Sequence, residues 1–256
     1  MPKPTPQARA LAEALRVARR AARLAATEVA DKLAWSQSTI SRIETGLRTA
    51  SVEEVSALLA IYQVTGERRE ALLSLARDSG HWWFADVALQ RETLAQYEKE
   101  ATKIVAFGTT LVPDLLRTPA YARATNSSVA MLGQKKFVAY VDEGVLRRQV
   151  GGPGVMTNQL RHLIAMAERP TVELRVIPFA AGAHPGGDYV LLEFGPARPL
   201  VYLKHRGTGL FLHRPSDVAP YGQSTVDAVA LDPSRSVRLI ESVVEARAQR
   251  GDLLRQ

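Results

Sequence analysis

Residues 26–46 constrain the fold of this chain more than any other segment. Ala30 is followed by Ala34 and then by Ile40, and these positions have the spacing of a helix-turn-helix. The small side chain of Ala30 lets the second helix cross the first one closely. Ala34 falls at the tight turn, and Ile40 anchors the second helix from its buried side. The segment therefore predicts two short helices in the arrangement that places a helix in the major groove of DNA.

Short polar side chains fill the positions between these anchors. Hydroxyl and amide groups suit base edges and phosphates, and Gln37 matches the N6/N7 edge of adenine. Arg16 and Arg20, on the preceding helix, are candidates for phosphate contact. The alternative for each residue is a solvated surface position. Glu44 is expected to pair with an arginine of the first helix or to cap locally, because DNA would repel a carboxylate. The full set of predicted DNA contacts is Arg16, Arg20, Thr27, Ser36, Gln37, Ser38, Thr39, Ser41 and Arg42.

The charge balance also favours an anionic partner. The net charge is +7, and residues 1–50 carry nine Lys and Arg against four Asp and Glu. A hydrophobic content of 46% supports a folded core. The chain has no cysteine, which excludes disulfides, thiolate metal sites and a cysteine nucleophile. No apolar run approaches the roughly 18 residues of a membrane span. We therefore expect a cytoplasmic protein with no membrane association.

Helix signals predict an all-α, five-helix domain over residues 1–80. Ser36 is a suitable N-cap for the third helix, and Gly46 is suited to follow its end. Ser51 and Glu54 form a capping box that opens the fourth helix. The expected helices cover residues 7–23, 27–33, 36–44, a segment from 51, and 67–78.

After residue 80 the pattern changes, and residues 81–256 are predicted to form an α+β domain with an antiparallel sheet. The segment 172–178 alternates apolar and charged residues as a half-buried strand does. Turn residues separate the later strands. Expected strands cover residues 137–141, 172–178, 189–194, 200–204 and 209–212, and expected helices cover residues 91–107, 119–125, 142–149, 155–168, 216–230 and 234–249.

The pattern Ser36-x-x-x-Ile40-Ser41-Arg42-Ile43-Glu44-x-Gly46 resembles the XRE (Cro/CI-like) helix-turn-helix family. Two positions depart from that family. Ala26 stands where the family usually has a Gln that braces the recognition helix and touches a phosphate, and Ala34 stands where it usually has Gly. A residue other than Gly in a left-handed conformation costs roughly 1 kcal/mol. Both departures bear on the strength of DNA binding.

The rest of the chain resembles the C-terminal domain of actinomycete XRE regulators, the WhiJ-like or Scr-type proteins. The resemblance implies an antitoxin-like role beside a small acidic partner protein. Only about twenty residues separate Ala122 from Asp142, fewer than is usual in that group, and Asp188 replaces a commonly apolar residue. The motifs that carry the resemblance include Trp82-Trp83, Tyr121-Ala122-Arg123, Asp142-Glu143, Gly151-Gly152-Pro153 and His184-Pro185-Gly186.

Six polar or aromatic residues of this second domain are candidates for ligand binding: Trp83, Glu98, Arg147, Arg148, His184 and Asp188. The alternatives are a Trp83 that packs at the domain junction, a Glu98 that pairs with a helix arginine, and a His184 that belongs to a loop at a pocket mouth. The sequence has no Gly-x-Ser-x-Gly, phosphate-binding loop or His-x-x-x-His spacing. No catalytic residue, metal site or cofactor is assigned.

These observations predict a sequence-specific DNA-binding transcriptional regulator. Its second domain is expected to sense a small molecule or a protein partner. Symmetric operators usually require a dimer, so we expect a homodimer on double-stranded DNA. Two alternatives stay open: an antitoxin-like protein that binds an acidic partner, and an enzyme that retains the helix-turn-helix as a scaffold.

Overall fold

The computed structural model describes residues 5–77, 82–127, 132–183, 187–205 and 208–253. The chain forms two compact units. The first consists of Met1–Glu100 with Pro196–Val218, and the second of Ala101–Gly195 with Ala219–Gln256. The sequence predicts two consecutive domains, residues 1–80 and 81–256, and this boundary stays a prediction.

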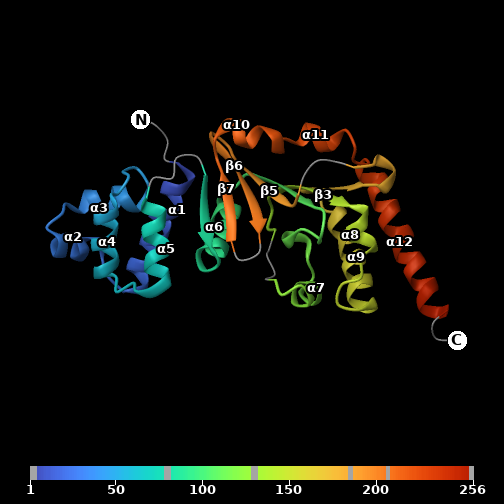
Figure 1. Cartoon of the computed structure of the whole chain (residues 1–256), viewed down its shortest axis with the longest axis horizontal. Helices are drawn as coiled ribbons and strands as arrows, with labels where there is room; N and C mark the ends of the chain where they lie inside the picture. Colours follow the sequence, from blue (N-terminus) through green and yellow to red (C-terminus); the bar gives the residue numbers. More distant parts are fainter. Residues whose placement is uncertain (1–4, 78–81, 128–131, 184–186, 206–207, 254–256) are drawn as a thin grey trace. The chain divides into compact units, whose positions relative to one another are not determined.

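Five helices open the first unit, in the predicted order (Figure 1). Ser36 caps the third by accepting a hydrogen bond from the Thr39 amide at 3.1 Å. Ser51 and Glu54 make the predicted capping box at the fourth. The helices are α1 (Pro6–Ala21), α2 (Ala26–Leu33), α3 (Gln37–Glu44), α4 (Val52–Ile61) and α5 (Gly66–Ala76).

The first unit continues with α6 (Val87–Glu100), three antiparallel strands and the short helix α10 (Pro215–Val218). Strand β7 (Thr208–Leu212) pairs with β1 (Trp82–Asp86) on one side and with β6 (Ala197–His205) on the other. Tyr97 of α6 is fully buried, and its ring meets that of Phe211 edge to face. Aromatic packing therefore ties α6 to the hairpin of β6 and β7.

The second unit contains a mixed sheet in the order β5-β2-β3-β4. β2 (Lys103–Gly108), β3 (Lys136–Asp142) and β4 (Val172–Ile177) run parallel, and β5 (Tyr189–Phe194) runs antiparallel to β2. The predicted α+β class is confirmed. The sheets contain antiparallel pairs, as expected, and parallel pairs in addition.

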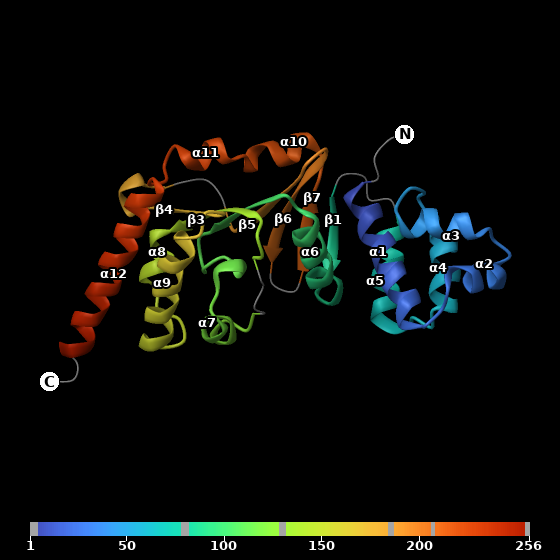
Figure 2. The same cartoon turned by 180° about the vertical axis from the view of Figure 1, so that it is seen from behind.

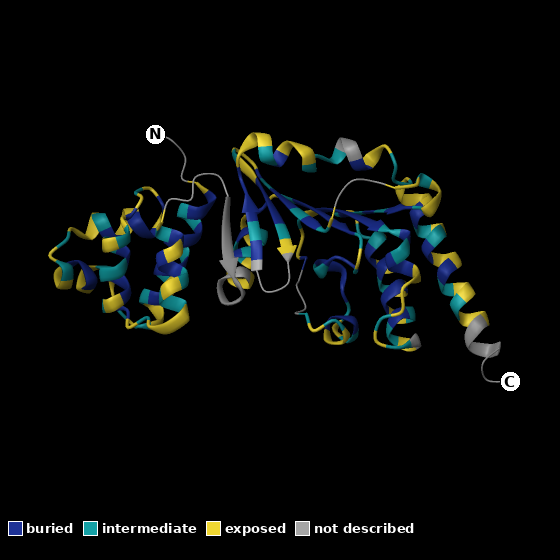
Figure 3. Cartoon of the chain, viewed as in Figure 1, coloured by how far each residue is buried: buried dark blue, intermediate teal, exposed yellow. Residues whose placement is uncertain are grey.

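Helices cover both faces of this mixed sheet. In Figures 1 and 2, α8 (Glu143–Arg147) and α9 (Pro153–Ala167) lie on one side of the strands and α11 (Gln223–Asp227) lies on the other. Because both faces are covered, the central strands are buried along nearly their whole length (Figure 3). The remaining helices are the 3-10 turns at Asp114–Leu116, Phe179–Ala181 and Ala219–Tyr221, α7 (Pro119–Ala124) and α12 (Pro233–Leu253).

Two predicted helices are wrong in part. The helix expected over 91–107 ends at Glu100, and β2 begins at Lys103, because this run pairs on both sides inside the sheet. The helix expected over 216–230 is three short pieces. Pro220 has no N–H to donate and Gly222 weakens a helix, so one continuous helix does not form there.

Candidate nucleic-acid interface

The turn between α2 and α3 has the geometry that the alanine spacing predicts. Ala34 adopts a left-handed conformation, with φ 52° and ψ 38°, and ends α2. The Trp35 amide donates to the Ala30 carbonyl at 2.9 Å, which closes the end of that helix. Ala30 and Ile40 are buried, so the two helices pack through the predicted anchors.

The predicted DNA contacts at and along α3 fall into two groups. Ser36 Oγ lies 2.8 Å from Ser38 Oγ and 2.9 Å from Thr39 Oγ1, so these three hydroxyls form a local cap. Gln37, Ser41 and Arg42 are exposed, and within the described part of the chain their side chains have no hydrogen-bond partner. The second group is therefore the one whose donors and acceptors are open to a ligand.

A buried ion pair fixes α3 on α1. Arg19 Nε lies 2.8 Å from Glu44 Oε1, and Arg19 Nη2 lies 2.8 Å from Glu44 Oε2. The Tyr62 hydroxyl donates to Glu44 Oε1 at 3.3 Å. The hydrogen bond to Glu44 raises the pKa of Arg19, and burial followed by the Glu44 charge raises the pKa of Tyr62. The expected pairing of Glu44 with an arginine of the first helix is confirmed.

The remaining predicted DNA contacts differ in exposure and in whether their side chains already have a partner. Arg16 forms an ion pair with Glu13, whereas Arg20 is exposed and has no partner among the described residues. Thr27 is exposed at the start of α2. Glu28 Oε2 accepts a hydrogen bond from the Ala25 amide at 2.6 Å at the start of α2. An acidic residue at the third position of a helix is the local signal for this capping contact.

Three of the six ligand candidates gather at one edge of the mixed sheet. Arg147 and Arg148 follow β3, and Asp188 precedes β5, which starts beside the end of β2. Asp188 Oδ1 accepts from the amide and the hydroxyl of Thr109, both at 2.6 Å. Arg147 pairs with the buried Glu143 at 2.6 Å, and Arg148 is exposed. The carboxyl ends of β2 and β3 meet at this edge, where open α/β sheets bind ligands.

The other three candidates belong to the first unit or fall outside the described residues. Glu98 belongs to α6 in the first unit. Trp83 lies on β1, but its side chain is outside the described residues, and His184 is outside them altogether. Over the described ranges, no cluster of three or more His, Asp or Glu is arranged to hold a metal ion. The same ranges contain no helix that is long and apolar enough to span a membrane.

Comparison with known proteins identifies two regions of the sequence. Residues 10–72 match a helix-turn-helix domain model, and residues 91–134 and 129–242 match a domain of unknown function, DUF5753. No curated protein matches the chain. The structure is similar to that of TrmBL2, an archaeal chromatin protein described as having a novel mode of DNA binding, with 12% identity and a TM-score of 0.33. That match covers 69% of this chain and 58% of TrmBL2, less than two thirds of its length.

Proposed function

Because the chain belongs to the DUF5753 family and carries a helix-turn-helix domain ahead of that region, we propose that it is a sequence-specific transcriptional regulator of the XRE type. The helix-turn-helix binds double-stranded DNA as part of a homodimer in the cytoplasm. The second module senses a small molecule or a protein partner. The single observation that carries the proposal is the exposed, unpaired set Gln37, Ser41 and Arg42 on α3.

The three side chains of this set have separate roles. Gln37 occupies the first turn of α3, which is the part of a recognition helix that reaches base edges. An amide bonds the N6/N7 edge of adenine through two hydrogen bonds, so Gln37 contributes base discrimination. Arg42, in the last turn, neutralises a phosphate, as does the hydroxyl of Ser41 by hydrogen bonding. Ser36, Ser38 and Thr39 act mainly by holding the start of the helix.

The test is binding of the full chain to DNA that contains its own promoter. Gln37→Ala should lose discrimination between the specific site and random sequence, at about 1–3 kcal/mol per lost bidentate contact. Arg42→Ala should weaken binding to all sequences and reduce the slope against log salt by about 1. Arg161→Ala, an exposed arginine of α9 without a described partner, is the matched charge control. Absence of DNA binding at low salt would refute the proposal.

The proposed homodimer and the proposed protein partner are each tested by a separate experiment. Sedimentation of the free protein and of its DNA complex gives the number of chains on one site. Arg148 is an exposed cation at the sheet edge that also holds Asp188 and Arg147. An antitoxin-like protein with an acidic partner would bind that partner there, and Arg148→Glu should release a partner purified with it.

A further inference from the structure

Four side chains form one row across the mixed sheet of the second unit. Arg175 on β4 pairs with Tyr140 on β3, Tyr140 with Phe107 on β2, and Phe107 with Tyr189 on β5. Paired residues of neighbouring strands point to the same face of a sheet. The segment 219–231, which includes α11 and which we call the strap, contacts this row: Tyr221 meets the Tyr189 ring at 5.1 Å between centroids. The row therefore lies under the strap.

The strap is fastened to the row chiefly by one carboxylate. Asp227 Oδ1 accepts a hydrogen bond from the Tyr140 hydroxyl at 2.5 Å and lies 3.7 Å from Arg175 Nη1. The Tyr140 side chain is fully buried, whereas the Asp227 side chain is 42% exposed. A buried phenol and a guanidinium thus hold a carboxylate that water also reaches.

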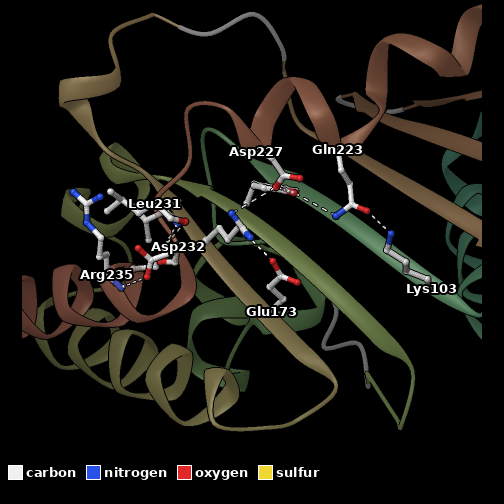
Figure 4. A network of polar contacts seen from close by, with 11 residues as sticks. Lys103, Glu173, Gln223, Asp227, Leu231, Asp232 and Arg235 are labelled. Atoms are coloured by element: carbon white, nitrogen blue, oxygen red, sulfur yellow. Dashed lines mark hydrogen bonds and ion pairs between the residues drawn. The ribbon is translucent and has the colours of Figure 1, made fainter.

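Gln223 makes the second attachment (Figure 4). Its Nε2 donates to the Tyr140 hydroxyl at 3.3 Å, and its Oε1 accepts from Lys103 Nζ. The Leu231 amide donates to the Val176 carbonyl at 2.8 Å and fixes the end of the strap. Between these points the strap has only short helical pieces, so it has little stability of its own.

One polar group under the strap is left unsatisfied. The Tyr189 side chain is 5% exposed, and its hydroxyl has no hydrogen-bond partner within the described residues. Burial raises the pKa of Tyr189 to about 12, with further contributions from Tyr221 and Asp227. A buried hydroxyl without a partner is costly and commonly marks a place where a water or ligand atom binds.

The charged groups around the row determine how many negative charges a ligand at this site would carry. Arg175 is paired with Glu173 at 2.6 Å, and Lys103 with Glu193 at 3.1 Å. These four groups sum to zero, and Asp227 adds one negative charge. An external ligand that replaced Asp227 with the same balance would carry a single carboxylate, since a polyanion would add negative charge that no described cation of the row compensates.

We propose that the Tyr140–Arg175 pair is a binding site for a small-molecule monocarboxylate, with Asp227 as its internal occupant in this structure. An external carboxylate replaces Asp227, its apolar part lies along Phe107, and a polar group at its far end reaches the Tyr189 hydroxyl. Replacement of Asp227 releases the strap from the sheet. As an account of effector sensing, this inference rests on the proposed function; as an account of a binding site, it does not.

Chemical rescue tests the site without DNA. In Asp227→Ala the internal carboxylate is absent, and acetate is the probe. Acetate at about 0.1 M should raise the melting temperature of this variant by about 3 °C over sodium chloride of equal ionic strength. The wild-type protein should respond by less than about 1 °C, because its own carboxylate occupies the site. Inorganic phosphate should give a smaller shift than acetate.

Matched variants separate a specific site from a general salt effect. Asp232→Ala removes an exposed carboxylate that accepts from the Arg235 amide at 2.9 Å at the start of α12, with no phenol beside it, so acetate should not rescue it. Adding Arg175→Met or Tyr140→Phe to Asp227→Ala should abolish the acetate response. An equal response in Asp227→Ala and Asp232→Ala, or one that persists in both double variants, overturns the proposal.

If Asp227→Ala does not fold, a second variant tests the same site. Asp227→Asn keeps the size of the side chain and one acceptor oxygen. Titration of this variant with acetate should shift the Tyr140 ring signals in NMR spectra to saturation, because the Tyr140 hydroxyl faces position 227; unshifted signals overturn the proposal. Neither readout involves DNA, so a protein that fails to bind any promoter still tests the carboxylate site, and failed rescue leaves the DNA-binding proposal intact.

Discussion

Arg19 and Glu44 join α1 to α3 through two parallel hydrogen bonds, each 2.8 Å long. The Glu44 side chain is 5% exposed and that of Arg19 is 14% exposed. Removing one partner leaves a charge in a poorly solvated position, which costs far more than losing a surface ion pair. The recognition helix thus depends on a charged contact with a helix that precedes the motif.

Glu44→Gln should lower the free energy of unfolding by about 3 kcal/mol, because Arg19 loses its buried counter-charge. Urea denaturation measures this. Glu92→Gln is the control: Arg68 and Glu92 also form two hydrogen bonds, of 3.1 Å each, but their side chains are 40% and 53% exposed. Its effect should stay under about 1 kcal/mol. Equal losses would show that Glu44 acts as a surface residue does.

Ala34→Gly should stabilise the protein by about 0.5–1 kcal/mol, because glycine adopts the left-handed conformation at φ 52° without the strain of a Cβ. Thermal unfolding provides the measurement. Ala60→Gly, at an exposed position of the ordinary helix α4, should instead destabilise by about 0.5–1 kcal/mol. A loss of stability in Ala34→Gly would mean that the turn is not strained.

Arg20→Ala should weaken DNA binding more than Arg16→Ala does. Arg16 is already paired with Glu13, so it has less charge to offer a phosphate, whereas Arg20 is exposed and unpaired in the described part of the chain. Fluorescence anisotropy across a salt series should show the slope falling by about 1 for Arg20→Ala and by less for Arg16→Ala. Equal decreases in slope would place both residues on the DNA, and two unchanged slopes would place neither there.

Acid should destabilise the second unit through His162. Burial lowers the pKa of this α9 histidine below its ordinary value. The unfolded chain therefore binds more protons than the folded one between the folded pKa and about 6.5, so the free energy of unfolding falls as the pH drops through that window. His162→Gln should flatten this part of the profile in urea denaturation at about pH 5 and about pH 7.5. An unchanged profile would assign the acid sensitivity to other groups.

Local signals predicted the first unit well because they act over a few residues. Helix starts are marked by Ser36 and Ser51, whose side chains accept hydrogen bonds from nearby backbone amides. The end of α3 is marked by Gly46, which adopts a positive φ of 71°. The structure confirms all three signals. The expected helix over 91–107 runs through β2 because it extends the pattern of α6, although the β-branched and aromatic Ile104, Val105 and Phe107 favour a strand, as the pairing with β3 and β5 confirms.

The sites of the second unit depended on contacts that are distant in sequence. Tyr140 and Asp227 are 87 residues apart, and no local pattern links a tyrosine in a strand to an aspartate after a broken helix. Three of the predicted ligand residues, Arg147, Arg148 and Asp188, do meet at one sheet edge, because β2 and β3 are parallel. The fourth described candidate, Glu98, folds with the other unit.

The chain passes from one compact unit to the other after Glu100, again after Gly195 and a third time after Val218. Neither unit is a single continuous stretch, so neither can be transplanted by one cut and one junction. A chimera that is meant to exchange DNA specificity must carry residues 196–218 together with residues 1–100. Evolution faces the same restriction, since recombination at a single point between these segments would leave a β6–β7 hairpin beside an α6 from a different parent.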